Sequence, residues 1–234
     1  MALLLIALAI APAAAIIWFV YTKDVHEKEP VNMLILAFGL GILSVIPAYI
    51  GYLISGDVFS VSGNPLITAG YAFGVVAISE EFAKFIFLRF VMFKKKAFNE
   101  PYDGIIYAVM ISMGFATFEN FMYVAEGGFG VGVLRMFTAV PAHAVFGVAM
   151  GYYVGLAKFD PQRRNEYLAK GLLWAVILHG AYDFFLMQTN IPALFIFSFI
   201  GLYQAIKWAR KAIKQHAAIS PFKEEEIYDP LRQN

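Results

Sequence analysis

Residues 31–54 read VNMLILAFGLGILSVIPAYIGYLI, a run of 24 residues without one charged side chain. A helix rises about 1.5 Å per residue and a bilayer core is about 30 Å thick, so roughly 20 such residues span a membrane. Six further apolar stretches flank this one. We therefore expect an all-α polytopic membrane protein, a bundle of about seven transmembrane helices. The expected spans are about 2–21, 31–54, 66–92, 103–125, 131–157, 169–188 and 191–209.

The composition of the 234-residue chain agrees with a membrane protein. Hydrophobic residues make up 60% and charged residues 15%, with a mean hydropathy of +0.66, whereas soluble domains have about 45–50% apolar and about 25% charged residues. The absence of cysteine excludes disulfides, thiolate metal ligands and a cysteine nucleophile. A net charge of +1 gives no basis for binding nucleic acid. The short links predict one membrane domain, 1–216, followed by a cytoplasmic tail, 217–234.

The basic residues predict the orientation. Of the 18 lysines and arginines, 15 lie on alternate links or in the C-terminal region. Because cytoplasmic links carry the excess of basic residues, we expect the N-terminus outside and the C-terminus in the cytoplasm. The stretch 2–21 could also be a secretory signal, since Pro12–Ala15 looks like a cleavage site, but no basic residue precedes its apolar run. A retained helix is favoured.

Ionisable side chains inside four of the spans mark the candidate site. A charge at the middle of a bilayer costs about 2.5–3.5 kcal/mol, so such residues are functional candidates by default. We predict four catalytic residues and four supporting or site-lining residues. The first group is Glu80, Glu81, His143 and His179, and the second is Lys84, Glu119, Asn120 and Asp183.

Local spacing predicts some of the contacts. Lys84 follows Glu80 by four residues and Glu81 by three, so either carboxylate can pair with the ammonium. His179 and Asp183 also share a helix face. Beyond His143, glycines recur every four residues and would let a neighbouring helix approach closely. Alternatively, these polar residues have no catalytic role and only hold the helices of the bundle together.

Several membrane chemistries lack their signatures. No His-Glu-x-x-His zinc motif, Gly-x-Ser-Gly serine motif or Gly-x-Gly-Asp aspartyl motif is present. What remains suits hydrolysis by a water molecule that a glutamate activates, with N–H groups stabilising the oxyanion. The same residues could hold a metal whose bound water attacks, with Glu80, His143 and His179 as ligands of Zn²⁺. The sequence leaves both versions open, and we expect no cofactor.

Two other functions use the same residues. A proton-coupled transporter could employ Glu80, Glu119 and His179 as relay groups, although no inverted repeat of the kind that transporters contain is visible. An inactive scaffold could bind other membrane helices.

Five strings of the sequence resemble the PrsW family of membrane proteases, within the wider group of CAAX and bacteriocin-processing proteases. They are Glu80-Glu-Phe-Ala-Lys-Phe85, Tyr102-Asp-Gly-Ile-Ile-Tyr107, Gly114-Phe-Ala-Thr-Phe-Glu-Asn-Phe-Met-Tyr123, Pro141-Ala-His143 and His179-Gly-Ala-Tyr-Asp-Phe184. The resemblance implies a multi-pass protease of the bacterial cell membrane that makes the first cut in a single-span anti-sigma factor (RsiW-like), on its extracytoplasmic side. That cut leads to release of a stress sigma factor. The implied partners are this substrate and membrane lipid, and the oligomeric state stays open.

The resemblance also implies roles for residues. The family's glutamate pair falls on Glu80 and Glu81, and its essential histidine falls on His179. By likeness to the CAAX proteases, Glu80 with His143 would activate water, while His179 and Asp183 would line the oxyanion side. The wider group often has arginine near the place of Lys84 and asparagine in the place of Asp183. Because an aspartate donates no hydrogen bond unless protonated, we expect Glu119-Asn120 to supply the donor.

Overall fold

The computed structural model describes residues 2–55, 64–188 and 191–223, and these ranges contain helices and no strand. This confirms the all-α prediction. The helices are α1 (Ala2–Lys23), α2 (Val31–Leu43), α3 (Val45–Ser55), α4 (Pro65–Tyr71), the π-helix η2 (Ala72–Ala77), α5 (Ile78–Phe90), the 3₁₀ turn η3 (Met92–Lys94), α6 (Pro101–Phe137), α7 (Ala139–Phe159), α8 (Arg164–Leu186), the 3₁₀ turn η4 (Pro192–Leu194) and α9 (Phe195–Ala218). Most of the predicted tail, 217–234, lies outside the described residues.

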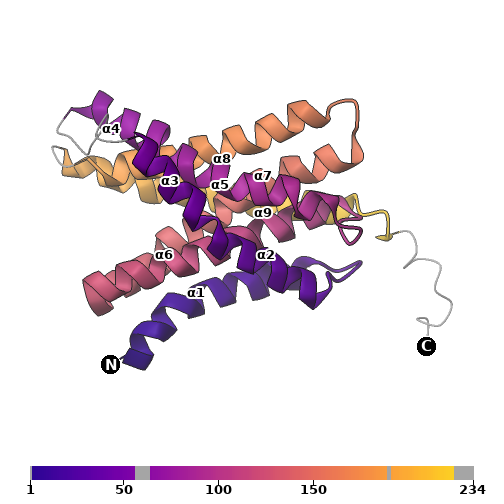
Figure 1. Ribbon diagram of the computed structural model, residues 1–234, viewed down its shortest axis with the longest axis horizontal. Coiled ribbons are helices and arrows are strands. Elements are labelled where there is room, and N and C mark those ends of the chain that lie inside the picture. The colour runs from indigo at the N-terminus through magenta and orange to yellow at the C-terminus, as the bar shows by residue number, and fades with distance from the viewer. Residues whose placement is uncertain (1, 56–63, 189–190, 224–234) are drawn as a thin grey trace.

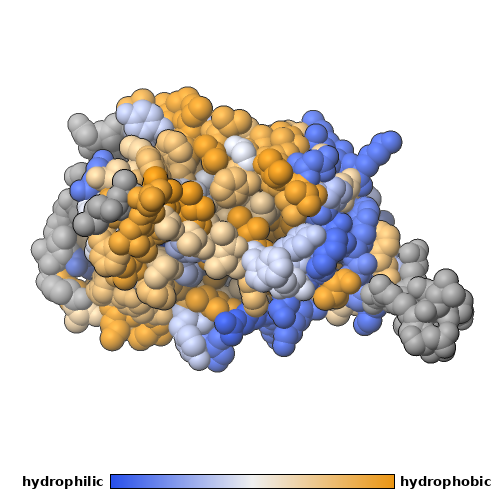
Figure 2. Space-filling model, turned by 90° about the horizontal axis from the view of Figure 1, so that it is seen from below, coloured by the Kyte–Doolittle hydropathy of each residue, from blue (hydrophilic) through white to orange (hydrophobic). Residues whose placement is uncertain are grey.

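Three stretches of the described chain are long and apolar enough to cross a membrane. They are Leu3–Lys23, Val31–Ser55 and Pro101–Phe159. In Figure 2 the hydrophilic side chains gather at one end, and the rest of the visible face is mainly hydrophobic. The α1–α2 turn, the α7–α8 turn and the end of α9 lie at the same end of the bundle (Figure 1). These features agree with a membrane protein, while seven crossings and their orientation stay predictions.

The longest of these stretches is a hairpin. Gly128 adopts φ +69° and ψ −157° within α6, a left-handed conformation that glycine reaches without steric cost. Beyond it the chain folds back, since the Nε of Arg135 lies 2.9 Å from the Oδ1 of Asn120, 15 residues earlier. In a straight helix these residues would be about 22 Å apart. The predicted link at 126–130 is therefore a reversal around one glycine.

The predicted span 31–54 is interrupted at Ser44. The Ser44 N–H donates to the carbonyls of Leu40 and Gly41, at 2.9 and 3.2 Å, and its hydroxyl donates to Gly41 at 2.6 Å. The predicted span is thus divided into α2 and α3 at Ser44, although Ser44 keeps helical dihedral angles (φ −67°, ψ −13°) and Val31–Ser55 as a whole is long enough to cross a membrane. The span predicted at 66–92 likewise contains the π-helix η2 directly before α5.

Helices α6 and α7 form the centre of the bundle by close backbone contact. A Cβ atom on Gly151 would lie 2.3 Å from the carbonyl oxygen of Gly104, a distance that no side chain can accept. The small-residue row predicted after His143 therefore packs against α6. Because α6 carries Glu119 and α7 carries His143, this contact fixes two parts of the site relative to each other.

Buried carboxylates hold the turns at the hydrophilic end. The Oδ2 of Asp24 accepts a hydrogen bond from the Glu29 N–H at 3.3 Å, and Glu29 accepts one from the Tyr107 hydroxyl. Glu100 and Asp103 form a capping box at the start of α6. Burial, with the nearby charge of Glu100 adding to it, raises the pKa of Asp24 to about 7. These turns therefore hold at least one carboxyl group that titrates near neutral pH.

Candidate active site

A cavity of about 690 Å³ lies between α3, the end of α4, η2, α5, α6, α7 and α8. This volume is in the usual range for ligand pockets, about 300–1,000 Å³. Most of its wall is apolar. The polar members of the lining are Tyr49, Tyr52, Tyr71, Glu80, Glu119, Tyr123, Arg135, His143, His179, Tyr182 and Asp183.

The adjacent glutamates of α5 have different surroundings. Glu80 is 4% exposed and lines the cavity. Glu81 is 0% exposed, is not part of the lining, and its Oε1 accepts hydrogen bonds from Lys84 at 2.7 Å and from His179 at 2.8 Å. Its Oε2 has no hydrogen-bond partner among the described residues. Of the two, Glu80 is therefore placed to meet a substrate.

Lys84 lies between these carboxylates, as its spacing predicts. Its Nζ is 2.7 Å from the Oε1 of Glu81 and 3.4 Å from the Oε2 of Glu80. It also lies 3.3 Å from the Nδ1 of His143 and 4.1 Å from the centre of the Phe115 ring. The ammonium is 1% exposed, so its charge is balanced by these neighbours and not by water.

The two histidines are held by carboxylates. The Nδ1 of His179 lies 2.8 Å from the Oε1 of Glu81, and its Nε2 lies 3.2 Å from the Oδ2 of Asp183. Carboxylates accept and do not donate, so both ring nitrogens of His179 act as donors when both bonds form. The Nε2 of His143 lies 3.0 Å from the Oε2 of Glu119. Because its Nδ1 faces the Lys84 ammonium, the partners assign His143 a proton on Nε2.

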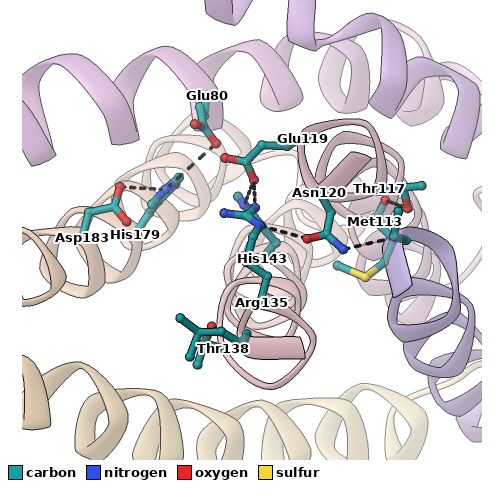
Figure 3. Close-up of polar contacts among 12 residues, drawn as sticks. Glu80, Met113, Thr117, Glu119, Asn120, Arg135, Thr138, His143, His179 and Asp183 are labelled. Atoms are coloured by element: carbon teal, nitrogen blue, oxygen red, sulfur yellow. Dashed lines mark hydrogen bonds and ion pairs between the residues drawn. The ribbon is translucent and has the colours of Figure 1, made fainter. Parts of the chain in front are cut away.

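Arg135 is the last charged residue of this network and binds Glu119. Its Nη2 donates to the Oε2 of Glu119 at 2.7 Å, and its guanidinium lies 4.0 Å from the centre of the Tyr123 ring. Figure 3 shows Arg135 and His143 reaching the same carboxylate of Glu119, with the His179 ring between Glu80 and Asp183. The charges of the site are thus linked from α5 through α7 and α8 to the α6 hairpin.

Asn120 does not have the role that we expected. Its amide donates to the carbonyls of Leu8 and Ala9 on α1, at 3.1 and 3.3 Å, and its Oδ1 accepts from Arg135. The side chain is fully buried and is absent from the lining of the cavity. The expectation that Glu119-Asn120 supplies an oxyanion donor is therefore wrong for Asn120, because helix packing engages its N–H groups elsewhere.

Of the predicted residues, Glu80, Glu81, His143 and His179 offer ligand atoms that all lie within 4.8 Å of one another. Lys84, Glu119 and Asp183 contact them directly. The predicted Glu80–His143 partnership takes another form, because the hydrogen bond of His143 goes to Glu119.

Two residues of the site were missed from the sequence. The hydroxyl of Tyr52 on α3 donates to the Oε1 of Glu80 at 2.5 Å, and Arg135 binds Glu119. Arg135 carried a signal, since it is one of three basic residues inside the predicted spans. Tyr52 carried none, because aromatic residues are common throughout this chain.

Residues 29–209 match the profile of a family described as "PrsW family intramembrane metalloprotease". This chain belongs to the PrsW family of intramembrane proteases. It is similar to "Protease PrsW" of Geobacillus kaustophilus, 35% identical over 90% of this chain and 91% of that protein. "Protease PrsW" of Bacillus subtilis is 33% identical over 87% of this chain and 94% of that protein. "Protease PrsW" of Oceanobacillus iheyensis is 37% identical over 82% and 87%. No solved structure matches the chain.

Membership of the PrsW family confirms the resemblance and makes the chain a membrane-embedded peptidase. The description of the family also implies a metal ion. Two carboxylates and two imidazoles within 4.8 Å are a donor set that Zn²⁺ accepts. However, the Lys84 ammonium lies among these atoms and contacts three of the four side chains. Two cations cannot share that space, so the arrangement described does not fit a divalent ion.

Proposed function

We propose that the chain hydrolyses a peptide bond of a single-span membrane protein near its extracytoplasmic side, with water activated by Glu80 and without a metal. The observation that carries the proposal is the placement of Glu80 on the wall of the 690 Å³ cavity, beside two histidines. The mostly apolar wall suits an apolar substrate segment, and the carboxylates and imidazoles gathered at one place in it can act on a peptide bond.

In this mechanism the Glu80 carboxylate takes a proton from water while the water oxygen bonds to the peptide carbonyl carbon. The carbonyl π electrons move to the oxygen, which becomes an oxyanion. The Nε2 of His179 lies 4.0 Å from the Oε2 of Glu80. In this mechanism its N–H, which is directed at Asp183 before substrate binds, turns to donate to the oxyanion. When the C–N bond breaks, Glu80 returns the proton to the leaving nitrogen.

The other polar residues support these two. Glu81 and Asp183 accept hydrogen bonds from opposite sides of the His179 ring and fix its orientation. This accounts for an aspartate at position 183, since the residue acts as an acceptor. Lys84 neutralises the buried Glu81, and Glu119 orients His143.

The side of the cut follows from the predicted orientation. The cavity lining includes Tyr71 at the end of α4 and Leu186 at the end of α8. Both belong to the end of the bundle away from the basic turns, which we expect to face outward. By the family resemblance, the substrate is an RsiW-like anti-sigma factor of a stress sigma factor, and the enzyme is a multi-pass protein of the bacterial cell membrane.

The test uses the full chain in liposomes with a single-span substrate, and mass spectrometry of the products. Glu80→Gln should lower kcat by about 10²–10⁴-fold, the usual contribution of a general base, while the variant elutes and melts like the wild type. Glu126→Gln removes an exposed carboxylate of α6 and serves as the matched control. Full cleavage by Glu80→Gln overturns the assignment, and products cut in the cytoplasmic half overturn the proposed side.

A further inference from the structure

Tyr52 contacts the proposed base from a helix that carries none of the predicted site residues. Its hydroxyl donates to the Oε1 of Glu80 at 2.5 Å. The other oxygen of Glu80, Oε2, lies 3.4 Å from Lys84 and 4.0 Å from His179. The two carboxylate oxygens therefore have different neighbours, a neutral phenol on one side and the charged network on the other.

Backbone packing brings Tyr52 to this place. A Cβ on Gly51 would lie 2.6 Å from the Oγ and 2.8 Å from the Cβ of Ser79. Gly51 directly precedes Tyr52, and Ser79 directly precedes Glu80. Helices α3 and α5 thus meet closely at the point where the phenol meets the carboxylate.

Helix α3 begins directly after Ser44, where α2 ends. A small apolar cluster, Ala48, Ala83 and Phe115, joins α3 to α5 and α6. The contact of α3 with α5 is therefore set locally, by small residues on both helices.

We infer that Tyr52 is a positioning residue for Glu80: its O–H holds Oε1 and so fixes the direction in which Oε2, on the side of Lys84 and His179, meets water and substrate. The inference rests on the proposed role of Glu80 as the base. A hydrogen bond to a charged group is among the stronger ones in proteins. Its loss should leave the carboxylate less well oriented toward water and substrate.

Charged and titratable groups from every neighbouring element also face Glu80. They are Glu81 and Lys84 on α5, Glu119 on α6, His143 on α7, and His179 and Asp183 on α8. Tyr52→Phe leaves all of them in place. A change in the kcat of this variant therefore reports the loss of the phenol hydroxyl.

The experiment measures kcat and KM separately for Tyr52→Phe in liposomes. We expect kcat to fall about ten-fold while KM stays within about two-fold of the wild-type value. Tyr203→Phe removes the hydroxyl of an exposed tyrosine on α9 and should match the wild type. A wild-type kcat in folded Tyr52→Phe, or a rise in KM alone, overturns the inference.

Substitutions at Gly51 and Ser79 test the contact between Tyr52 and Glu80 without changing Tyr52. Gly51→Ala should force α3 away from Ser79 and reproduce the kinetic effect of Tyr52→Phe. Adding Ser79→Gly removes the obstructing atoms and should restore most of kcat, and melting curves show whether each variant is folded. A folded Gly51→Ala with a normal kcat, or no recovery in the double variant, counts against the inference. Normal cleavage by Glu80→Gln would refute the proposed function itself. Normal kinetics in Tyr52→Phe together with an inactive Glu80→Gln would refute only the inference about Tyr52.

Discussion

Replacing Lys84 by methionine, which keeps most of the shape and removes the charge, should strongly destabilise the fold. The ammonium is 1% exposed and contacts Glu81 at 2.7 Å. Without it, the fully buried Glu81 keeps one partner, His179, on one oxygen. Removing one member of a buried ion pair costs about 3–5 kcal/mol, a large part of the roughly 5–15 kcal/mol that stabilises a typical protein.

For a chain of this length, that loss corresponds to a fall in Tm of about 6–20 °C, measured by thermal unfolding in detergent. Lys84→Met combined with Glu81→Gln removes both charges and should recover much of the loss, because the two sites are coupled. The matched control is Lys170→Met, in which Lys170 pairs with Glu166 at 2.6 Å on the surface. It should leave Tm nearly unchanged, since exposed ion pairs contribute little. A wild-type Tm for Lys84→Met, or strictly additive effects in the double variant, would refute this reasoning.

Three further predictions follow from the contacts described. Activity should survive dialysis against a chelator in metal-free buffer; loss that is reversed by added Zn²⁺ would show that the metal version is right. Asp183→Ala removes the acceptor at the Nε2 of His179 and should lower kcat by about ten-fold or more, whereas unchanged kcat would mean that Asp183 does not orient the ring. Burial raises the pKa of Asp24 to about 7 in the folded protein, so its carboxyl group keeps a proton below that pH. In the unfolded chain the same group loses its proton above about pH 4. Stability contributed by Asp24 should therefore be lost as pH rises from about 4 to 7. Asp24→Asn should flatten that part of a plot of Tm against pH, and an equally steep plot in the variant would exclude Asp24 as the cause.

Contacts within one helix were predictable from the sequence. Lys84 follows Glu81 by three residues, and Asp183 follows His179 by four, and helical geometry alone places these side chains together. Hydrophobic length predicted α1 for the same reason, because a span depends on local composition. The glycine row on α7 indicated a close neighbour but could not identify it as α6.

Contacts between helices were not predictable in this way. The reversal at Gly128 redirects the chain through one residue and returns Arg135 to Glu119. The close approach of Gly51 to Ser79 brings Tyr52 to Glu80. Neither pairing has a periodic signal, because its geometry depends on how separate helices pack. Asn120 was misjudged for the same reason, since its partners lie on α1.

The positive charge at the centre of the polar network is covalently part of the chain, on the side chain of Lys84. Each folded copy therefore carries one ammonium for the buried carboxylate of Glu81, in a fixed ratio and at a fixed place. The pairing of these two charges forms when the side chains of α5 pack, and it does not depend on the concentration of any ion in the medium.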